Sequence, residues 1–510
     1  FDQSRTCYVK ALAIREKVLP TDDPDLATVL YVLANVEGKT GHYEKGRELD
    51  ERAVAIWEKS GGPDSPKMAL GQFGLGYMLR DLGDLAGAKT AWERALQIWE
   101  KNYSPDHPKA VAALKNLSNV LYLLGEMTRA RQMRERVLVS WEKTFGPDHT
   151  YVAYALNNLG TSLLDAGDIA GARSLFERAL ASHEKNYGAE DLEVAVPLIN
   201  LANVAFMMGD YAEARRLRER ILSVREKALG PEHPEVAADL ADLGVALMNL
   251  DDDPGAQALF ERALAIQEKV LGTENADLAR TLTDLAIIRE DEKDYPAARM
   301  LYQRALNIQQ KSLGAESPSV AFTLAALGGL SYLTGDGADA KRQYQQALAI
   351  REKMFGTDHS EVADILNRMA MLDWDAGDGT AALDLSLQAE TILREQFQRT
   401  APSLAEREAL RFEISRVSGL SMALSALASA TPSHPLPPRS IERTWNEVIR
   451  SRALVLDEMA ARNVSMIAEP SPELRGLSQT LIASRDRLAS LVVRGPDPEA
   501  PEGYREELMQ

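Results

Sequence analysis

Four histidines have the most obvious chemical potential in this chain, because an imidazole can bind a metal ion or transfer a proton. They occupy one position of a repeating pattern, at His107, His149, His233 and His359. Equivalent atoms on adjacent helix pairs lie roughly 10 Å apart, whereas zinc binds its nitrogen ligands at about 2 Å. Neighbouring histidines therefore cannot share a metal ion. We predict a structural Asp-His-Pro turn before a helix, with no metal site and no cofactor.

Other catalytic arrangements are missing from the sequence. The single cysteine, Cys7, has no His beside it that could activate a thiol. The glycines of Gly335-Asp336-Gly337 lie between two helical segments and do not follow a strand, so they are no nucleotide-binding loop. We predict no catalytic site and no enzyme activity in this chain. One cysteine also excludes a disulfide framework, which favours a reducing compartment, and we expect the cytoplasm.

The elements that carry these side chains come from a block of 42 residues that recurs nine times in register. A lysine marks each block: Lys17, Lys59, Lys101, Lys143, Lys185, Lys227, Lys269, Lys311 and Lys353. Fixed periods of this length are typical of a solenoid, in which each unit covers the apolar face of its neighbour. We interpret the Glu-Lys pairs around this lysine as solvated charge worth a few tenths of a kcal/mol.

Each block contains two helices. In the fourth, apolar residues at helical spacing predict helices over about 150–166 and 169–185, ended by Gly167 and Gly188. A small residue recurs where the helices should meet: Ala34, Gly76, Ser118, Gly160, Ala202, Gly244, Ala286, Gly328 and Ala370. A larger side chain there would cost about 1–3 kcal/mol. In two of the turns between the helices, Asp251 and Lys293 replace the usual Gly.

Charge and hydropathy restrict the partners. The net charge is −18, from 58 Lys and Arg against 76 Asp and Glu. Nucleic acid and anionic membranes require a basic surface, so we expect neither as a direct partner. No apolar run approaches the ~18–20 residues of a membrane span. A peptide or a protein is the expected partner.

Several phrases resemble the tetratricopeptide repeat (TPR) of the kinesin-light-chain-like, 42-residue type. They are RALAIQEKVLGTE (262–274), ALAIREKMFGTDHSEVADILNRMA (347–370) and FGPDHTYVAYALNNLG (145–160). The resemblance implies an all-α, right-handed superhelical solenoid whose first helices line a concave groove for an extended peptide or a partner helix. We expect a half repeat over 1–19, nine units over 20–398 and a helical tail over 399–510. A solenoid cut at Phe1 exposes an apolar end through which it could self-associate.

The same resemblance implies which residues line the groove. In the family, amides of the first helix hydrogen-bond the ligand backbone, and an amide both donates and accepts. The matching candidates are Lys115, Asn116, Asn119, Tyr154, Asn157, Asn158, Asn200, Asn203, Asp242 and Asp284. Lys115, Asn119 and Asn158 also match half of the carboxylate clamp of TPR co-chaperones. Val196 and Asn200 replace its two cations, so we favour a solvated groove face.

A row of tryptophans occupies one repeat position, at Trp57, Trp99 and Trp141. Packing at a helix end explains the row. A partly exposed row of aromatic rings could also bind a partner.

Beyond residue 398 the period is lost, and we predict helices over about 404–428, 441–463 and 472–493. The strings ERTWNEVIRSRALVLDEMAARN (442–463) and PELRGLSQTLIASRDRLASL (472–491) resemble the linker between TPR repeats and a CHAT domain, the caspase-like cysteine protease module of bacteria. The sequence ends at Gln510, before any His and Cys dyad. Two functions stay open: the sensor and regulatory region of a bacterial CHAT protease, and a free-standing adaptor of kinesin-light-chain type.

Overall fold

The computed structural model describes residues 2–400, 420, 423–424, 439–448 and 450, and its regular elements are all helical there. Helix α1 (Asp2–Val18) comes first. Nine helix pairs follow within 2–400: α2 (Pro24–Lys39) with α3 (Tyr43–Gly61), α4 (Pro66–Asp81) with α5 (Leu85–Asn102), α6 (Pro108–Leu123) with α7 (Met127–Phe145), α8 (Thr150–Asp165) with α9 (Ile169–Tyr187), α10 (Ala195–Met207) with α11 (Tyr211–Leu229), α12 (Pro234–Met248) with α13 (Asp253–Leu271), α14 (Asp277–Asp291) with α15 (Tyr295–Leu313), α16 (Pro318–Leu333) with α17 (Gly337–Phe355), and α18 (Ser360–Asp375) with α19 (Gly379–Thr400). This is the predicted all-α TPR solenoid of nine pairs after a single helix.

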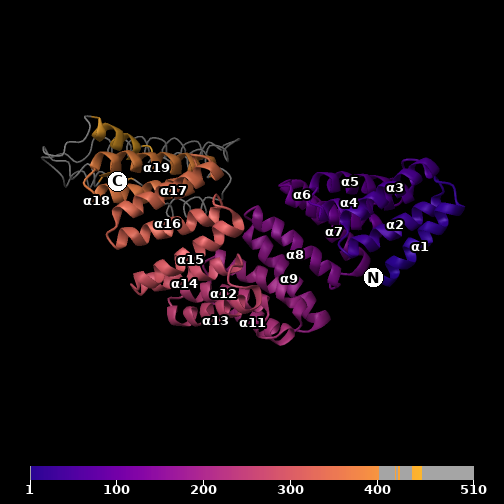
Figure 1. Cartoon of the computed structure of the whole chain (residues 1–510), viewed down its shortest axis with the longest axis horizontal. Coiled ribbons are helices and arrows are strands. Elements are labelled where there is room, and N and C mark those ends of the chain that lie inside the picture. The colour runs from indigo at the N-terminus through magenta and orange to yellow at the C-terminus, as the bar shows by residue number, and fades with distance from the viewer. Residues whose placement is uncertain (1, 401–419, 421–422, 425–438, 449, 451–510) are drawn as a thin grey trace, which may run out of the picture. The chain divides into compact units, whose positions relative to one another are not determined.

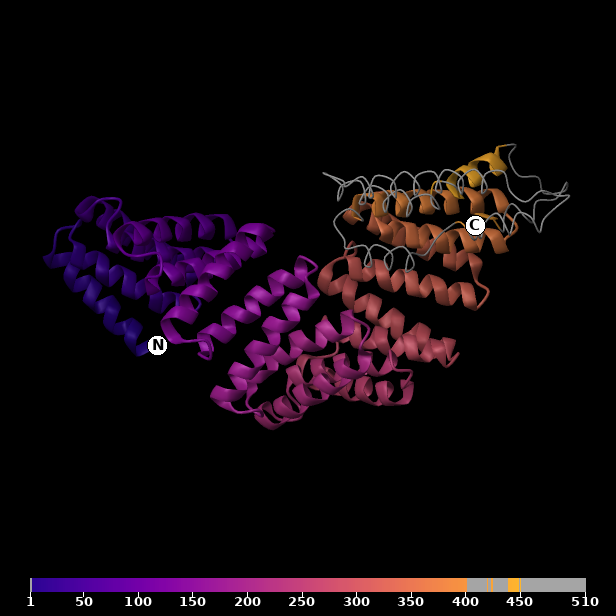
Figure 2. The same ribbon diagram turned by 180° about the vertical axis from the view of Figure 1, so that it is seen from behind.

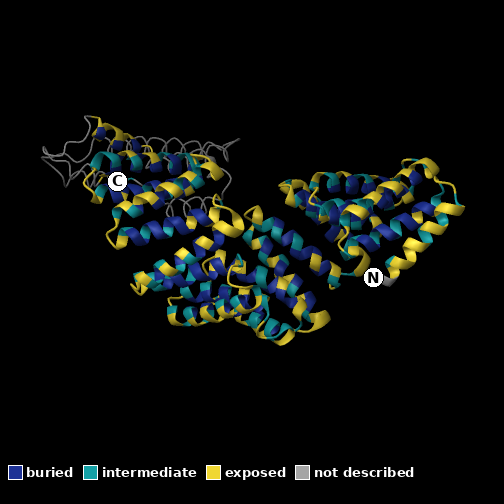
Figure 3. Ribbon diagram, in the orientation of Figure 1, coloured by how far each residue is buried: buried dark blue, intermediate teal, exposed yellow. Residues whose placement is uncertain are grey.

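The chain divides into two compact parts, an N-terminal part (1–259) and a C-terminal part (260–510), with the boundary inside α13. In both, consecutive helices lie side by side as hairpins (Figures 1 and 2). Burial follows one stripe of each helix and exposed residues follow the outer face (Figure 3). The core of the N-terminal part includes Trp92, Trp99 and Leu117, and that of the C-terminal part includes Tyr302 and Leu327.

Helix ends follow the predicted chemistry. The histidines cap the first helices: Nδ1 of His149 accepts the backbone N–H of Tyr151 at 3.1 Å, and its ring stacks on Phe145 at 4.6 Å. His107, His233 and His359 make the same capping bond. The structural role of this histidine row is confirmed. The turns use positive φ, which Gly adopts without strain, and the replacements Asp251 and Lys293 adopt it too, at 58° and 65°.

The structure confirms the close seam between the two helices of a unit, because aromatic rings of the second helix pack against the small residues of the first. A Cβ added to Gly76 would lie 2.4 Å from Nε1 of Trp92, and one added to Gly160 would lie 2.5 Å from Cε1 of Phe176. Aromatic rings of the second helices therefore occupy the space that a side chain on the first helix would need.

The fifth first helix starts later than the repeat predicts. A 3-10 turn, η1 (Leu192–Val194), precedes α10, which begins at Ala195. Pro197 has no N–H and cannot close an α-helical bond to the residue four positions earlier. The repeat is regular in length here, but this proline moves the helix start.

The marker lysine is exposed, as the interpretation of mostly solvated charge predicts, and it also forms a recurring ion pair. Each described bridge joins the lysine to an acidic residue 37 positions earlier, in the turn before the first helix of the same pair: Lys143 Nζ lies 2.6 Å from Asp106 Oδ2, and Lys311 Nζ lies 2.8 Å from Glu274 Oε2. Lys101, Lys185, Lys227 and Lys353 bridge to Asp64, Asp148, Glu190 and Glu316 in the same way. The lysine thus joins the end of each second helix to the turn before the first helix of its own pair, although an exposed pair of this kind contributes little stability.

The tail is described only in part. Residues 440–448 are helical, at the start of the predicted helix 441–463. Glu447 of this segment accepts a bond of 2.6 Å from Nε of Arg394 on α19. The predicted helix 472–493 lies outside the described residues, as does nearly all of 404–428. None of the described helices is long and apolar enough to cross a bilayer.

Candidate functional site

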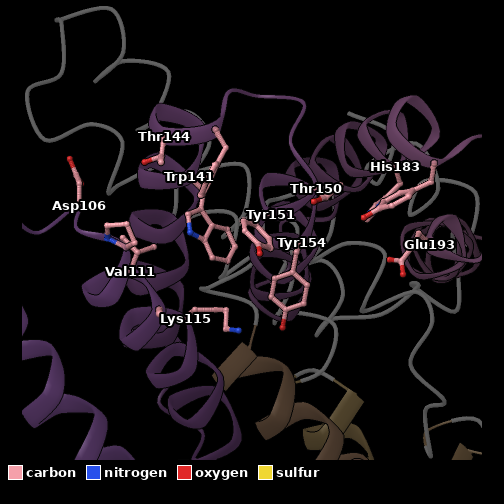
Figure 4. A pocket seen from close by; sticks show the side chains of 14 residues that line it. Asp106, Val111, Lys115, Trp141, Thr144, Thr150, Tyr151, Tyr154, His183 and Glu193 are labelled. Atoms are coloured by element: carbon pink, nitrogen blue, oxygen red, sulfur yellow. The ribbon is translucent and has the colours of Figure 1, made fainter. Parts of the chain in front are cut away.

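A pocket of about 480 Å³ opens in the N-terminal part, where the four consecutive helices α6 to α9 meet (Figure 4). The N-terminal half of α6, the start of α8 and η1 contribute one part of the wall, and the C-terminal ends of α7 and α9 contribute the rest. The lining residues are Asp106, Pro108, Val111, Ala112, Lys115, Trp141, Thr144, Phe145, Thr150, Tyr151, Tyr154, His183, Tyr187 and Glu193. The pocket therefore belongs to the stacking of units three to five.

Exposed aromatic rings dominate the wall. The ring of Trp141 lies 5.4 Å from that of Tyr151 and 6.5 Å from that of Tyr154, between centroids. Lys115 extends its ammonium toward Tyr154, with Nζ 5.8 Å from the ring centroid (Figure 4). Tyr151 and Tyr154 are about half exposed, at 53% and 44%. Clustered exposed aromatic rings are typical of binding surfaces, since they give large contact area at low entropic cost.

One substitution in the repeat explains why the pocket is open. Trp57 and Trp99 are buried, and each contacts an aromatic residue 26 positions earlier: Tyr31 at 5.9 Å and Phe73 at 5.2 Å between ring centroids. The equivalent residue before Trp141 is Lys115, whose flexible chain lies toward Tyr154 instead. Trp141 is therefore left partly exposed. Packing accounts for the first two tryptophans of the row, and the third lines the pocket.

Polar groups are few at this site. His183 lines the pocket and is buried, its Nδ1 has no hydrogen bond in the described part of the chain, and burial lowers the pKa of its imidazole. Asp106 is occupied by Lys143 and by Ser140, whose hydroxyl donates at 3.0 Å, and the bond from Lys143 holds the pKa of Asp106 below its usual range. The site can bind apolar surface and offer a neutral imidazole for one hydrogen bond.

The structure places the predicted groove residues in different surroundings. Lys115 and Tyr154 line the pocket. Asn116 is 4% exposed and donates from Nδ2 to the Tyr77 hydroxyl at 2.7 Å, and the buried Asn157 accepts a long bond of 3.4 Å from Nδ2 of Asn200. The side-chain amides of Asn116 and Asn157 thus bond to other residues of the protein.

The remaining candidates lie along the first-helix face. Asn119 and Asn158 are partly exposed. Asn203 accepts a bond of 2.6 Å from Arg218, whose other terminal nitrogen lies 2.8 Å from Asp242. Asp284 is partly buried on α14 in the C-terminal part, and its Oδ2 lies 4.0 Å from Nε of Arg280.

Sequence reasoning missed most of the pocket wall, including Tyr151, Tyr187 and His183, and a buried arginine of α7, Arg134. A usable signal existed for the pocket: Lys115 stands where the two earlier units have Tyr31 and Phe73. Within the described residues, no group of His, Cys, Asp and Glu could hold a metal ion.

Stacked helix pairs with small-residue seams define a helical-repeat scaffold. The chain belongs to the tetratricopeptide repeat family. The family model described as Tetratricopeptide repeat matches residues 1–59, 67–138, 112–185, 193–269, 241–311, 277–353 and 319–395. No curated protein matches the chain significantly.

Several solved structures are similar to this chain. The quorum sensor NprR from B. thuringiensis, in its apo form, is 12% identical with a TM-score of 0.54, over 68% of this chain and 93% of that chain. TPR-like repeats described as a kinesin light chain of Podosopora anserina are 22% identical with a TM-score of 0.37, over 40% of this chain and 97% of that chain. BtubC (BKLC) from P. vanneervenii is 20% identical with a TM-score of 0.39, over 45% and 92%.

Proposed function

We propose that this chain binds an extended peptide segment of a partner protein on the first-helix face of units three to five, and that the pocket at Trp141 receives one large apolar or aromatic side chain of that segment. The open ring of Trp141 carries this proposal. In the two preceding units, the chain itself supplies the ring that covers the equivalent tryptophan, from Tyr31 and Phe73. A ligand side chain fits the same place beside Trp141, because Lys115 leaves it open.

Replacing Tyr154 or Tyr151 with Ala is expected to weaken peptide binding at least tenfold, since anchor pockets carry most of an interface's affinity. Peptides selected on the complete chain from a displayed random library supply the probe, and isothermal titration measures their affinity. Both tyrosines are about half exposed, so the variants should fold normally by circular dichroism. Met300→Ala, at an exposed site of α15, is the control. Unchanged affinity in both tyrosine variants would refute the pocket.

The groove amides are tested separately. Replacing Asn158 and Asn200 together with Ala is expected to weaken the same peptides several-fold, because ligand backbone would lose two side-chain amides, while helix content stays intact. If only the tyrosine variants lose affinity, the pocket binds the ligand and these amides do not.

For the biological role, we propose that the chain is the sensor and regulatory region of a CHAT-type cysteine protease, in which peptide binding is transmitted to the tail. The strings at 442–463 and 472–491 support this role, since a free-standing adaptor does not need them. Sequencing the complete parent protein tests it: a strand-rich domain after residue 510, with a His followed by a Cys, is expected. Its absence favours the adaptor.

A further inference from the structure

His183 of α9 is a buried imidazole in the wall of the pocket at Trp141 (Figure 4). The residue is 7% exposed, and its ring stacks on that of Tyr187 at 5.8 Å between centroids. Nδ1 is sealed from solvent and has no hydrogen bond in the described residues, whereas Nε2 is not sealed. Buried polar groups are normally hydrogen-bonded, because desolvation without a partner is costly. The imidazole therefore has one nitrogen that a molecule in the pocket can reach.

The chain shows how the same repeat position is satisfied elsewhere. In two later units, the residue at this position bonds to the residue 14 positions further on, on the next first helix. The bonds join Arg225 Nη1 to Asp239 Oδ1 at 2.9 Å, and Thr323 Oγ1 to Gln309 Oε1 at 2.8 Å. The residue 14 positions after His183 is Pro197, which is buried and has no polar side-chain group. The first helix that satisfies the later units thus offers His183 no partner.

The surroundings of the ring keep it neutral. Burial lowers the pKa of the His183 imidazole, and the carboxylates of Glu193 and Asp191 oppose this shift only in part. Helix α10 brings no titratable residue to the ring. The titratable groups around it are Tyr187 on its own helix, Tyr151 and Tyr154 on α8, Glu193 on η1 with Asp191 just before it, and Asp106 and Lys115 across the pocket (Figure 4).

We infer that His183 is a specificity-determining residue whose Nε2 hydrogen-bonds an uncharged polar group at the end of the ligand side chain that enters the pocket. This inference rests on the proposed peptide-binding function. A side chain that fills the pocket covers the open face of the imidazole and removes water from Nε2. A purely apolar side chain would leave both ring nitrogens without a partner, whereas a hydroxyl or N–H group at its end replaces the water. The pocket therefore selects an apolar body with a polar end.

The same geometry makes the ligand and a proton compete for the chain. A protonated imidazole carries its charge on a ring whose Nδ1 is sealed without an acceptor, and a bound side chain would desolvate the remaining face. Ligand binding therefore lowers the pKa of this imidazole further. Affinity should be constant where the free imidazole is neutral, and should fall as the pH drops through its pKa in the free chain, by at most about tenfold per pH unit.

The variants His183→Gln and His183→Leu test the inference on the complete chain, with the displayed peptides of the proposed function that contain no His. Gln267 and Gln309 occupy the equivalent position, so His183→Gln should fold, and its amide forms a hydrogen bond but does not titrate. Replacing the polar end of the inserted side chain, for example a phenol by a phenyl ring, should weaken binding to the unmodified chain about tenfold. The same replacement should cost nothing on His183→Leu.

Fluorescence anisotropy of labelled peptides between pH 5 and pH 8 gives the second measurement. The unmodified chain should bind more weakly at low pH, and His183→Gln should show a flat profile. His233→Asn is the control: it removes another imidazole, which caps α12 outside the pocket, and Asn supplies a capping oxygen. Its profile should match that of the unmodified chain.

The outcomes separate this inference from the proposed function. Peptides that depend on Tyr154 but bind equally well without the polar group would overturn this inference alone. The same pH profile in His183→Gln and in the unmodified chain would also overturn it, and this comparison stays valid if His183→Leu does not fold. Peptides that ignore Tyr154 would overturn the proposed pocket instead.

Discussion

Replacing Asp50 with Asn is expected to make the protein much more stable at pH 8 and to leave its stability at pH 4 nearly unchanged. Asp50 lies on α3, is fully buried, and neither of its carboxylate oxygens has a hydrogen-bond partner in the described residues. Burial raises the pKa of its carboxyl to about 8. The side chain therefore stays protonated in the folded protein at pH values where an unfolded chain would ionise it.

The sign of the effect follows from proton linkage. The folded state holds a proton that the unfolded chain releases near pH 4, so folding stability falls as the pH rises from about 4 to about 8. Each unit of pKa difference corresponds to about 1.4 kcal/mol, which makes the loss on the order of 3–5 kcal/mol at pH 8. Asn resembles the protonated carboxyl in shape and does not ionise, so the variant avoids this loss.

Urea unfolding followed by circular dichroism at pH 4.5, 6 and 8 measures the difference, and hydrogen exchange of α2–α4 locates it. The exposed Glu48→Gln on the same helix is the control, and it should change the stability little at any pH. Equal pH dependence of the Asp50 variant and the unmodified chain would contradict the prediction.

Replacing Gly328 with Ala or Leu is expected to destabilise the C-terminal part (260–510) by about 1–3 kcal/mol, more for Leu than for Ala. A Cβ at Gly328 would lie 2.7 Å from ring carbons of Tyr344, inside the seam between α16 and α17. The ring is buried and packed, so it cannot move away without displacing other core residues. Thermal unfolding of the variants measures the cost.

The adjacent glycine provides the matched control. At Gly329 the nearest atom to an added Cβ is the Tyr344 hydroxyl at 3.7 Å, an ordinary contact. Gly329→Ala should therefore stabilise the helix by about 0.5–1 kcal/mol through the lower entropy of Ala in the unfolded chain. Two identical substitutions, one residue apart, should act in opposite directions. Destabilisation of equal size at both positions would show that the seam is not the cause.

The position of Asp50 shows how far a repeat alignment can be followed. Trp92, Phe176, Phe260, Tyr302 and Tyr344 occupy the equivalent place in other units and cover the small residues of the seam. Three units carry a charge there instead, at Asp50, Arg134 and Arg218. Only the contacts distinguish them: Arg218 is paired within the chain, Arg134 has neutral acceptors, and Asp50 has no hydrogen bond in the described residues.

Periodicity by itself determined the fold. The 42-residue spacing, the small residue of the seam and the turn glycines are local properties, and they predicted nine helix pairs and the structural role of the histidines. A repeat guarantees that what holds in one unit holds in the next, so one correctly interpreted unit gives the architecture.

The candidate site was decided by tertiary structure, because it arises where neighbouring units stop being equivalent. Lys115 opens a pocket only because it fails to cover Trp141, and Asn116 is unavailable only because Tyr77 reaches it from the preceding unit. The first effect depends on two helices of one unit, on side chains 26 residues apart, and the second on two neighbouring units, on side chains 39 residues apart. The sequence shows which residues repeat, whereas the packing between units determines which of them a ligand can reach.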